Sequence, residues 1–456
     1  MSNKHSWPKW ATPVLLSAAM LSACGVTPLA KSDASPAGSA SSSAQAGTAQ
    51  AEMDWSKLGD GSQKGKKITV LMVDTDGRVS QMVKKFTEET GIEVNFMGVD
   101  YNSLFGKITT ASLSNSSDID VIEMDTIWGG QFYEGKIATD LTNVLPKETL
   151  ANYTQSSVDS VIYNSHVLAI PYYSSSKHLY WNKKLLADAG YDAPPKTWDE
   201  FREMSKKLTK NGVYGSAWSW KQAESLNIDF DTIVAAFGGK LLDDQGKLHV
   251  NSPEAVQALT YMTDLLHTDK TVDPSSLQWT EDDVKNAFSA GKIAMMINWE
   301  GMYPDLNNPD MSQVVNQSDV GLIPGQGSAK STAVSGSEGI GIMQSSKNKQ
   351  AALEFVKWIG EKEFQLDNFK EMGIYPSLKS LYEDPDMIAA DSTKTLGKIV
   401  EQFQYGSNRP NAPGYVEWAD IQSNEIYNAL VKNKTPQQAL DDAAAKIDQA
   451  IQRAAK

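Results

Sequence analysis

The chain has 456 residues with 42 Lys and Arg, 56 Asp and Glu, five His and one Cys, and its formal net charge is −14. At about 100–200 residues per domain, this length predicts two or three domains. The acidic balance excludes proteins whose main partner is a nucleic acid, because phosphate binding requires a basic face. One cysteine excludes a disulfide framework, and the scattered histidines lack the spacing of a zinc site. We therefore expect no cofactor and no bound metal.

The N-terminus has the pattern of a secretion signal. Two lysines precede an apolar stretch, 11–21, that is too short to span a bilayer. The sequence Leu-Ser-Ala-Cys-Gly at 21–25 resembles the bacterial lipobox, in which Cys24 is lipidated and becomes the mature N-terminus. We therefore expect residues 1–23 to be a lipoprotein signal peptide, and acyl chains on Cys24 to hold the protein on the extracellular face of the membrane. An ordinary signal peptide that happens to contain a cysteine is the alternative.

Residues 24–65 predict a flexible tether. The stretch 25–53 is rich in Ala and Ser and contains no aromatic residue, so it cannot bury enough apolar surface to offset its ordering entropy. Beyond Cys24 no apolar run reaches the length of a transmembrane helix. The protein is therefore expected to be tethered to the membrane rather than embedded in it.

After the tether, short apolar runs alternate with amphipathic segments. Residues 68–73 predict a buried strand, and the apolar spacing from Val79 to Phe86 predicts one face of a helix that ends at Gly91. Further strands are predicted at 92–96, 119–124 and 293–297, and further helices from 197, at 253–267, 283–290 and 349–359 and near the C-terminus. This alternation predicts an α/β fold with parallel sheets.

Several polar and aromatic clusters fall where these strands should end. Ligands of open α/β sheets bind outside the carboxyl ends of the strands. An exposed indole covers the apolar face of a pyranose, and nearby carboxylates accept hydrogen bonds from its hydroxyl groups. The clusters thus suit a sugar, and they contain Asp74, Asp76, Asp125, Trp128, Trp299 and Glu300, with Trp218, Trp220 and Trp418 in other Gly, Ser or Pro-rich turns.

Each of these residues also has a purely structural interpretation. A single Trp such as Trp128, Trp218 or Trp220 is more often part of a core than of a binding site. Asp74 and Asp76 are equally suited to capping the helix that follows them. Composition and spacing alone therefore suggest a sugar site without establishing it.

From about residue 67 to the C-terminus, the chain resembles the extracellular solute-binding proteins of ABC importers, the group that includes maltodextrin-binding proteins. Six stretches carry the resemblance: 68–96, 119–140, 169–201, 288–301, 334–359 and 409–418. The order and spacing of these stretches along the chain make the resemblance specific. The resemblance implies two α/β domains, each a mainly parallel sheet flanked by helices, joined by a hinge with the ligand between them. It places the N-terminal domain at 66–174 and 335–374, and the C-terminal domain at 178–333 and 376–456. The implied crossings lie near 174–177, 333–337 and 374–377.

The resemblance also implies which residues touch the ligand. Residues 74–78 match a loop that contacts sugar hydroxyls, and the other matched positions supply a carboxylate or an aromatic ring. The residues implied are Asp74, Asp76, Arg78, Asp125, Trp128, Tyr173, Trp218, Trp220, Trp299, Glu300 and Trp418. Tyr173 lies beside the hinge, where it faces either the ligand or the crossing itself.

We therefore expect the protein to be a lipid-anchored, monomeric receptor. It is expected to close on a carbohydrate, in the first place an oligosaccharide, and to deliver it to the transmembrane subunits of a permease. The same fold binding a non-sugar solute is one alternative. An extracellular glycoside hydrolase that uses Asp125 and Glu300 as its carboxylate pair is the other. The chain lacks the eight strand–helix units of a barrel, so we expect a binding protein and not an enzyme.

Overall fold

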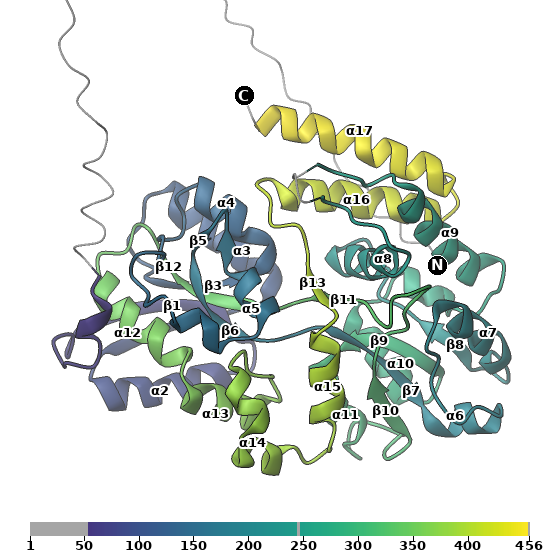
Figure 1. Ribbon diagram of the computed structural model, residues 1–456, viewed down its shortest axis with the longest axis horizontal. Helices are drawn as coiled ribbons and strands as arrows, with labels where there is room; N and C mark the ends of the chain where they lie inside the picture. The colour runs from purple at the N-terminus through teal and green to yellow at the C-terminus, as the bar shows by residue number, and fades with distance from the viewer. Residues whose placement is uncertain (1–52, 244–246, 455–456) are drawn as a thin grey trace, which may run out of the picture. The chain divides into compact units, whose positions relative to one another are not determined.

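The computed structural model describes residues 53–243 and 247–454, which form two larger β-sheets covered by helices and two short two-stranded sheets (Figure 1). The predicted signal peptide, Cys24 and residues 24–52 of the predicted tether lie outside the described residues. No helix in the described part of the chain is both long enough and apolar enough to cross a membrane.

The first sheet has five strands in the order β2-β1-β3-β12-β6. The first three strands in this order are parallel, whereas β12 runs antiparallel to both β3 and β6. We call this sheet and its helices the first lobe. Its strands are β1 (Lys67–Val73), β2 (Glu93–Val99), β3 (Val121–Asp125), β6 (Ala169–Tyr173) and β12 (Glu338–Ile342), and its helices are α2 (Arg78–Thr90), α3 (Tyr101–Leu113), α4 (Gly129–Glu134), α5 (Gln155–Ser160), α12 (Lys349–Ile359), α13 (Lys362–Met372) and α14 (Pro385–Ala390).

The second sheet has four strands in the order β10-β7-β9-β8, of which only β8 and β9 pair in parallel. We call this sheet and its helices the second lobe. Its strands are β7 (Lys177–Asn182), β8 (Tyr214–Ala217), β9 (Ile293–Trp299) and β10 (Ser318–Gly321), and its helices are α6 (Lys183–Asp188), α7 (Trp198–Leu208), α8 (Glu224–Ala236), α9 (Pro253–His267), α10 (Glu281–Ser289), α11 (Tyr303–Leu306), α15 (Leu396–Phe403), α16 (Tyr415–Leu430) and α17 (Pro436–Ala454).

Short elements complete the described chain. The two-stranded sheets are β4 (Ile162–Tyr163) with β5 (His166–Val167), and β11 (Ala333–Ser335) with β13 (Gly406–Asn408). The 3-10 helices are η1 (Trp55–Lys57), η2 (Thr126–Trp128), η3 (Thr149–Asn152), η4 (Pro274–Leu277), η5 (Glu300–Met302) and η6 (Lys379–Glu383).

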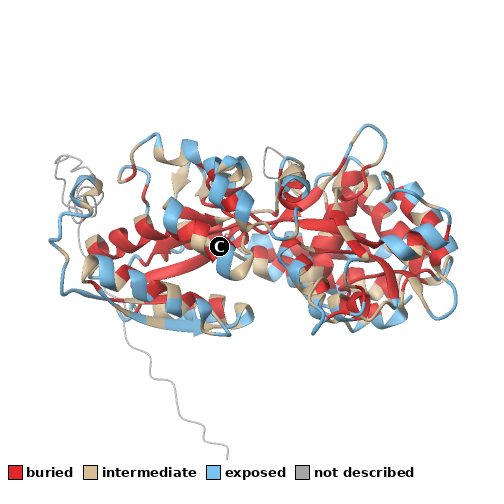
Figure 2. Cartoon of the chain, turned by 90° about the horizontal axis from the view of Figure 1, so that it is seen from below, coloured by how far each residue is buried: buried red, intermediate tan, exposed pale blue. Residues whose placement is uncertain are grey.

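Local chemistry explains why the predicted elements form. The predicted face of α2 is the buried one, since Val79, Val83 and Phe86 are its buried residues. Gly91 ends the helix with φ 71°, a left-handed conformation that costs glycine little. Thr197 accepts a hydrogen bond from the backbone N–H of Glu200 and so caps α7, as predicted. In Figure 2 most strands of the two larger sheets are buried, with the edge strand β2 as an exception, while the covering helices keep exposed outer faces.

The segment that leads from β6 into β7 pairs with the segment that leads from β11 into β12. Ser176 and Ser335 form an antiparallel bridge, and Gly336 N donates to Ser175 O at 3.0 Å. Ser175 N donates to Ser337 Oγ at 3.2 Å. We call residues 174–176 and 335–337 the hinge segments, and they fall at the first two predicted crossings.

The third passage between the lobes lies later in the chain than the sequence predicts. Pro376 forms a bridge with Tyr173, and Ser174 N donates to Tyr375 O, so these residues still belong to the edge of the first sheet. Because α14 packs on α13 and α15 packs on β10, the contacts favour a passage between 390 and 396.

The described end of the predicted tether packs on α12. Met53 is buried, and Asp54 N donates to Gln350 Oε1 at 2.7 Å. The N–H of Gly59 donates to both carboxylate oxygens of Glu354, at 2.9 and 3.0 Å. Residues 53–59 are thus attached to the first lobe by backbone hydrogen bonds as well as by one buried side chain.

Candidate functional site

The ends of several strands meet at one edge of each sheet. In the first sheet Asp125, the last residue of β3, is paired with Glu338, which is paired in turn with Tyr173 at the end of β6. In the second sheet Trp299, the last residue of β9, is paired with Lys177, the first residue of β7. Three of the predicted residues, Asp125, Tyr173 and Trp299, therefore lie at strand ends next to the hinge segments, where open α/β sheets bind ligands.

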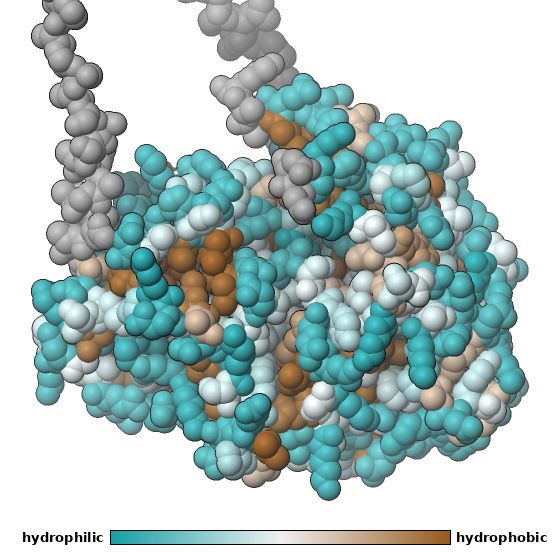
Figure 3. Space-filling model, viewed as in Figure 1, coloured by the Kyte–Doolittle hydropathy of each residue, from teal (hydrophilic) through white to brown (hydrophobic). Residues whose placement is uncertain are grey.

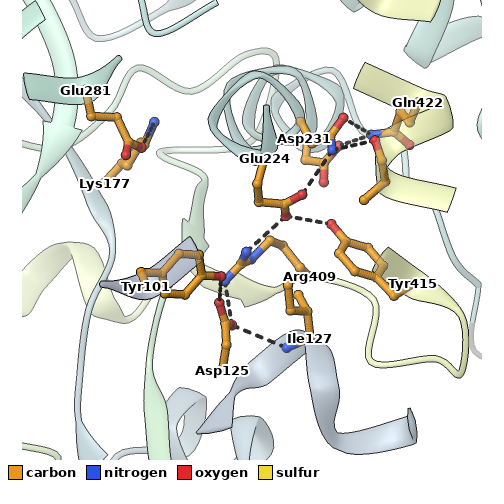
Figure 4. Close-up of polar contacts among 12 residues, drawn as sticks. Tyr101, Asp125, Ile127, Lys177, Glu224, Asp231, Glu281, Arg409, Tyr415 and Gln422 are labelled. Atoms are coloured by element: carbon orange, nitrogen blue, oxygen red, sulfur yellow. Dashed lines mark hydrogen bonds and ion pairs between the residues drawn. The ribbon is translucent and has the colours of Figure 1, made fainter. Parts of the chain in front are cut away.

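Arg409 joins the two lobes (Figure 4). Its guanidinium lies between Asp125 Oδ1, at 2.7 Å, and Glu224 Oε1 on α8, at 3.0 Å. Tyr101 donates to the other oxygen of Asp125, and Tyr415 donates to Glu224 Oε1 at 2.9 Å. The Arg409 side chain is only 3% exposed, so these contacts are charge-assisted hydrogen bonds shielded from water. We call Arg409, Asp125 and Glu224 the arginine triad.

Aromatic rings surround the triad. Trp128 stacks on Tyr101 with ring centroids 5.9 Å apart and planes inclined by 20°. Trp418 meets the ring of Tyr415 edge to face at 5.1 Å, and its helix α16 contacts η2, which contains Trp128. Trp128 and Trp418 are 3% and 5% exposed, so their rings are covered here by protein atoms.

Lys177 forms a second buried ionic cluster beside the hinge segments. Its ammonium lies 2.9 Å from Asp229 Oδ1 and 3.0 Å from Glu281 Oε1, and its side chain is fully buried. Trp299 donates from Nε1 to the same oxygen of Glu281 at 2.9 Å, and its ring centroid lies 5.5 Å from the ammonium. We call Lys177, Asp229 and Glu281 the lysine triad. It holds Trp299 by a hydrogen bond and a cation–π contact.

Trp299 and Glu300 also contact both hinge segments. A Cβ built on Gly336 would lie 2.7 Å from Cζ3 of Trp299, so the indole is in tight contact with this glycine. Glu300 Oε2 accepts hydrogen bonds from Ser175 Oγ and from Ser176 N, both at 3.1 Å. Burial raises the pKa of Glu300 to about 7. The end of β9 therefore fixes the hinge segments as well as facing the site.

Further carboxyl groups are buried nearby. Glu123 Oε2 accepts from Val73 N at 2.6 Å, and burial raises the pKa of Glu123 to about 7. Burial and then the charge of Glu123 raise the pKa of Glu338 well above its ordinary value. The pKa of Asp231 is also raised well above its ordinary value, mainly by burial and secondly by the charge of Glu224. Asp231 accepts a hydrogen bond from Gln422. The site therefore concentrates more acidic groups than cations.

The predicted first loop lies at a different place from the triads. Asp74 caps α2 by accepting from Gly77 N and Ser80 N. The exposed Arg78 pairs with Asp76 at 2.7 Å, and its guanidinium donates to Glu371 O at the end of α13. Arg78 also lines a pocket of about 340 Å³ together with Gly301 of the second lobe. The capping interpretation of Asp74 thus has direct support, while contact of this loop with a ligand stays a prediction.

Trp218 and Trp220 are core residues in this structure. Their rings stack at 5.4 Å, Trp218 also stacks on Trp198 at 6.1 Å, and neither is more than 2% exposed. Tyr173 is half-buried and meets Tyr172 edge to face. Trp299 is the one predicted tryptophan of the site that is not fully buried among the described residues.

Sequence reasoning missed the residues that hold the site together. Arg409 and Tyr415 stand in one of the stretches that carry the family resemblance, but no role was predicted for either. Lys177 begins a strand whose residues are all buried, and its charge therefore requires a buried carboxylate partner, but the sequence alone does not mark this strand as buried. Tyr101, Glu224 and Glu281 lie on helices, and nothing local marks them as partners of strand-end residues.

No group of three or more potential metal ligands occurs in the part of the chain that the structure describes. The two carboxylates of the hydrolase alternative belong to separate networks, since Asp125 is bound to Arg409 and Glu300 to the hinge segments.

A pocket of about 380 Å³ on the first lobe is lined by α2 and α13 and lies away from the triads. Most of the face in Figure 3 is hydrophilic, and an apolar patch is visible on the half that carries the first lobe.

Comparison with known proteins adds independent information. The family model described as a bacterial extracellular solute-binding protein matches residues 72–366. A probable ABC transporter-binding protein of Deinococcus radiodurans is 27% identical over 337 residues, which are 72% of this chain and 79% of that protein. The diacetylchitobiose-binding protein of Streptomyces coelicolor is 25% identical over 409 residues, 85% of this chain and 90% of its own. The sn-glycerol-3-phosphate-binding periplasmic protein of Shigella flexneri is 26% identical over 344 residues, with 71% and 74% covered.

Solved structures show the same architecture. Maltose-bound MalE3 of T. maritima superimposes with a TM-score of 0.77 at 27% identity, covering 84% of this chain and 99% of the other. A solute-binding protein of Agrobacterium radiobacter K84 in complex with ribitol gives a TM-score of 0.75 at 26% identity, with 84% and 98% covered. The expected two-domain fold is thereby confirmed.

Proposed function

The chain belongs to the bacterial extracellular solute-binding protein family, and on that premise we propose that it is the carbohydrate-binding receptor of an ABC importer. Members of this family bind solutes for ABC transporters and are not enzymes. Ligand favours the state in which both lobes touch it, so capture and closure are one equilibrium. The receptor then delivers the sugar to the transmembrane subunits of its permease.

One observation carries the choice of a hydroxylated ligand. The described residues contain twelve buried side-chain atoms without a hydrogen-bond partner, and six of them belong to residues of the triads, the hinge segments or their immediate neighbours. They are Thr126 Oγ1, Ser176 Oγ, Glu338 Oε2, Asn408 Oδ1, Arg409 Nε and Trp418 Nε1. Buried polar atoms are normally paired, so such a cluster marks a place where a partner belongs. Hydroxyl groups suit this mixture of donors and acceptors, because each can donate and accept.

The binding residues that we propose are those predicted from the sequence, apart from the core residues Trp218 and Trp220, together with the arginine triad. Trp299 is the first stacking platform, because its ring is half-buried and is held by Glu281 and Lys177. If stacking hides about 80 Å² of apolar surface, it contributes about 2 kcal/mol. Micromolar affinity requires about 8 kcal/mol, so stacking must be combined with several hydrogen bonds.

We further propose that acyl chains on Cys24 anchor the receptor to the extracellular face of the membrane. The lipobox-like sequence at 21–25 supports this proposal. Replacing Cys24 with serine is expected to move the protein from the membrane fraction to the soluble fraction, because the anchor requires the thiol. Fractionation followed by immunoblotting measures the effect. A Cys24→Ser protein that stays in the membrane fraction would show that another segment holds it there.

The sugar site is tested by isothermal titration of the purified protein with maltose, diacetylchitobiose, ribitol and a set of amino acids. We expect binding of at least one of the three hydroxylated compounds. For that ligand, Trp299→Ala should weaken affinity about 30-fold, because about 2 kcal/mol of stacking is lost. Trp418→Ala should weaken it by a similar factor. Trp55→Ala is the matched control, since Trp55 is half-buried on residues 53–59, outside the site.

Binding of an amino acid alone would favour the non-sugar alternative. Equal affinity of the Trp299→Ala, Trp418→Ala and wild-type proteins for a sugar would show that the ligand lies elsewhere. Release of shorter sugars during incubation with an oligosaccharide would favour the hydrolase alternative.

A further inference from the structure

The two buried cations of the site are both shared between two carboxylates. Arg409 binds Asp125 and Glu224, and Lys177 binds Asp229 and Glu281. With both acids ionised, each triad therefore carries a net charge of −1. Neither cation has a charge left over for a bound solute.

Four further acidic residues lie near the triads, and none of them forms a salt bridge in the described chain. Glu123, Glu300, Glu338 and Asp231 are each at most 9% exposed, and no salt bridge joins any of them to a basic residue within the described chain. Burial raises the pKa of each one, because a carboxylate that is removed from water loses solvation. An anionic ligand would meet the same cost of burial, next to two triads that already carry more carboxylates than cations.

From this distribution of charge we infer that the site rejects anionic solutes and that its ligand is a polyhydroxy compound without a phosphate or carboxylate group. The inference rests on the proposed function and narrows its substrate class. It separates this chain from its relative that is named for sn-glycerol 3-phosphate. The unpartnered Arg409 Nε and Trp418 Nε1 donate hydrogen bonds but bring no charge beyond the one that the triad already neutralises.

The test uses charged probes at constant ionic strength, because salt screens exposed charges and would otherwise alter the comparison. Thermal shift and isothermal titration are measured with inorganic phosphate, sn-glycerol 3-phosphate and, as the uncharged counterpart, glycerol. For the wild-type protein we expect no stabilisation by phosphate or by sn-glycerol 3-phosphate. Juxtaposed like charges should make the anion at least about 100-fold weaker than any neutral ligand found in the sugar panel.

Two isosteric substitutions are predicted to create affinity for an anion. Glu224→Gln and Glu281→Gln each remove one negative charge, while the Oε1 atom that accepts from Tyr415 or from Trp299 is kept. The double variant should gain affinity for sn-glycerol 3-phosphate by about 10-fold or more, because Arg409 and Lys177 are then each balanced by one carboxylate. Glu417→Gln is the matched control, since Glu417 is exposed and pairs with Arg453 at the surface. If the double variant does not fold, each single variant is measured instead.

Each result has a defined meaning. Wild-type protein that ignores both anions, together with a folded variant that gains affinity for them, supports the inference. Binding of sn-glycerol 3-phosphate to the wild type, when glycerol does not bind, overturns it. A folded variant that gains nothing overturns the role given to the carboxylates. If none of the neutral sugars binds, the result counts against the proposed function, whereas the measured affinities for phosphate and sn-glycerol 3-phosphate keep their meaning.

Discussion

Replacing Arg409 with methionine is expected to lower the free energy of unfolding by about 3–5 kcal/mol at neutral pH. The side chain is 3% exposed and is bound to one carboxylate from each lobe. Its removal leaves Asp125 and Glu224 buried without a counter-charge, which costs more than the ion pairs contribute by themselves. Denaturant unfolding followed by tryptophan fluorescence measures the loss.

A triple variant separates charge from packing. Arg409→Met combined with Asp125→Asn and Glu224→Gln removes all three charges and should recover much of the stability, because uncharged amides cost less to bury than unpaired carboxylates. Equal stability of the single variant and the wild type would mean that the arginine triad is open to water in solution. A triple variant that is as unstable as the single variant would place the effect in packing and not in charge.

Replacing Gly336 with alanine is expected to change how the two lobes are held, because the added methyl group overlaps the ring of Trp299. The new Cβ would lie 2.7 Å from Cζ3 and 2.8 Å from Cη2, and the backbone of Gly336 is not left-handed, so space alone opposes the change. We expect a loss of about 1–3 kcal/mol in unfolding free energy. The indole is displaced from the hinge segments, so the distance between the lobes should shift and affinity for the sugar found by titration should fall about 10-fold.

Spin labels at Leu113→Cys on the first lobe and Met311→Cys on the second report the distance between the lobes. Both positions are exposed, and the single natural cysteine is replaced by serine for the measurement. Gly301→Ala is the matched control, because a Cβ there meets no atom within 4 Å. An unchanged distance distribution in Gly336→Ala would contradict the role of Trp299 at the hinge. If that variant does not fold, Trp299→Leu tests the same contact from the other side.

The sequence was sufficient to predict elements whose causes are local. The apolar spacing of α2 and the caps of α7 and α9 are set by residues within a few positions of each helix end, and these helices form as expected. Strand direction is set by tertiary connections, so the antiparallel pairing of β12 with β3 and β6 could not be read from the alternation of strands and helices. The same holds for the third passage between the lobes, which depends on where α14 and α15 pack.

The sequence indicated which residues end the strands, but it did not indicate which residues they contact. Asp125, Trp299 and Glu300 were selected because they follow strands, and the structure places all three at strand ends. Arg409 is 284 positions from Asp125, and no spacing rule connects them. The burial of Trp218 likewise depends on Trp198 and Phe201, which come from helix α7.

The attachment of residues 53–59 to α12 gives the receptor a mechanical asymmetry. Gly59 and Asp54 are hydrogen-bonded to Glu354 and Gln350 of the first lobe, so a pull applied from the N-terminal side is borne by that lobe. The second lobe is joined to it through the hinge segments, the passage at 390–396 and the loop that contains Arg409. In the lipid-anchored receptor that we propose, tension from the membrane would therefore act on the first lobe alone and would not oppose a rotation of the second lobe.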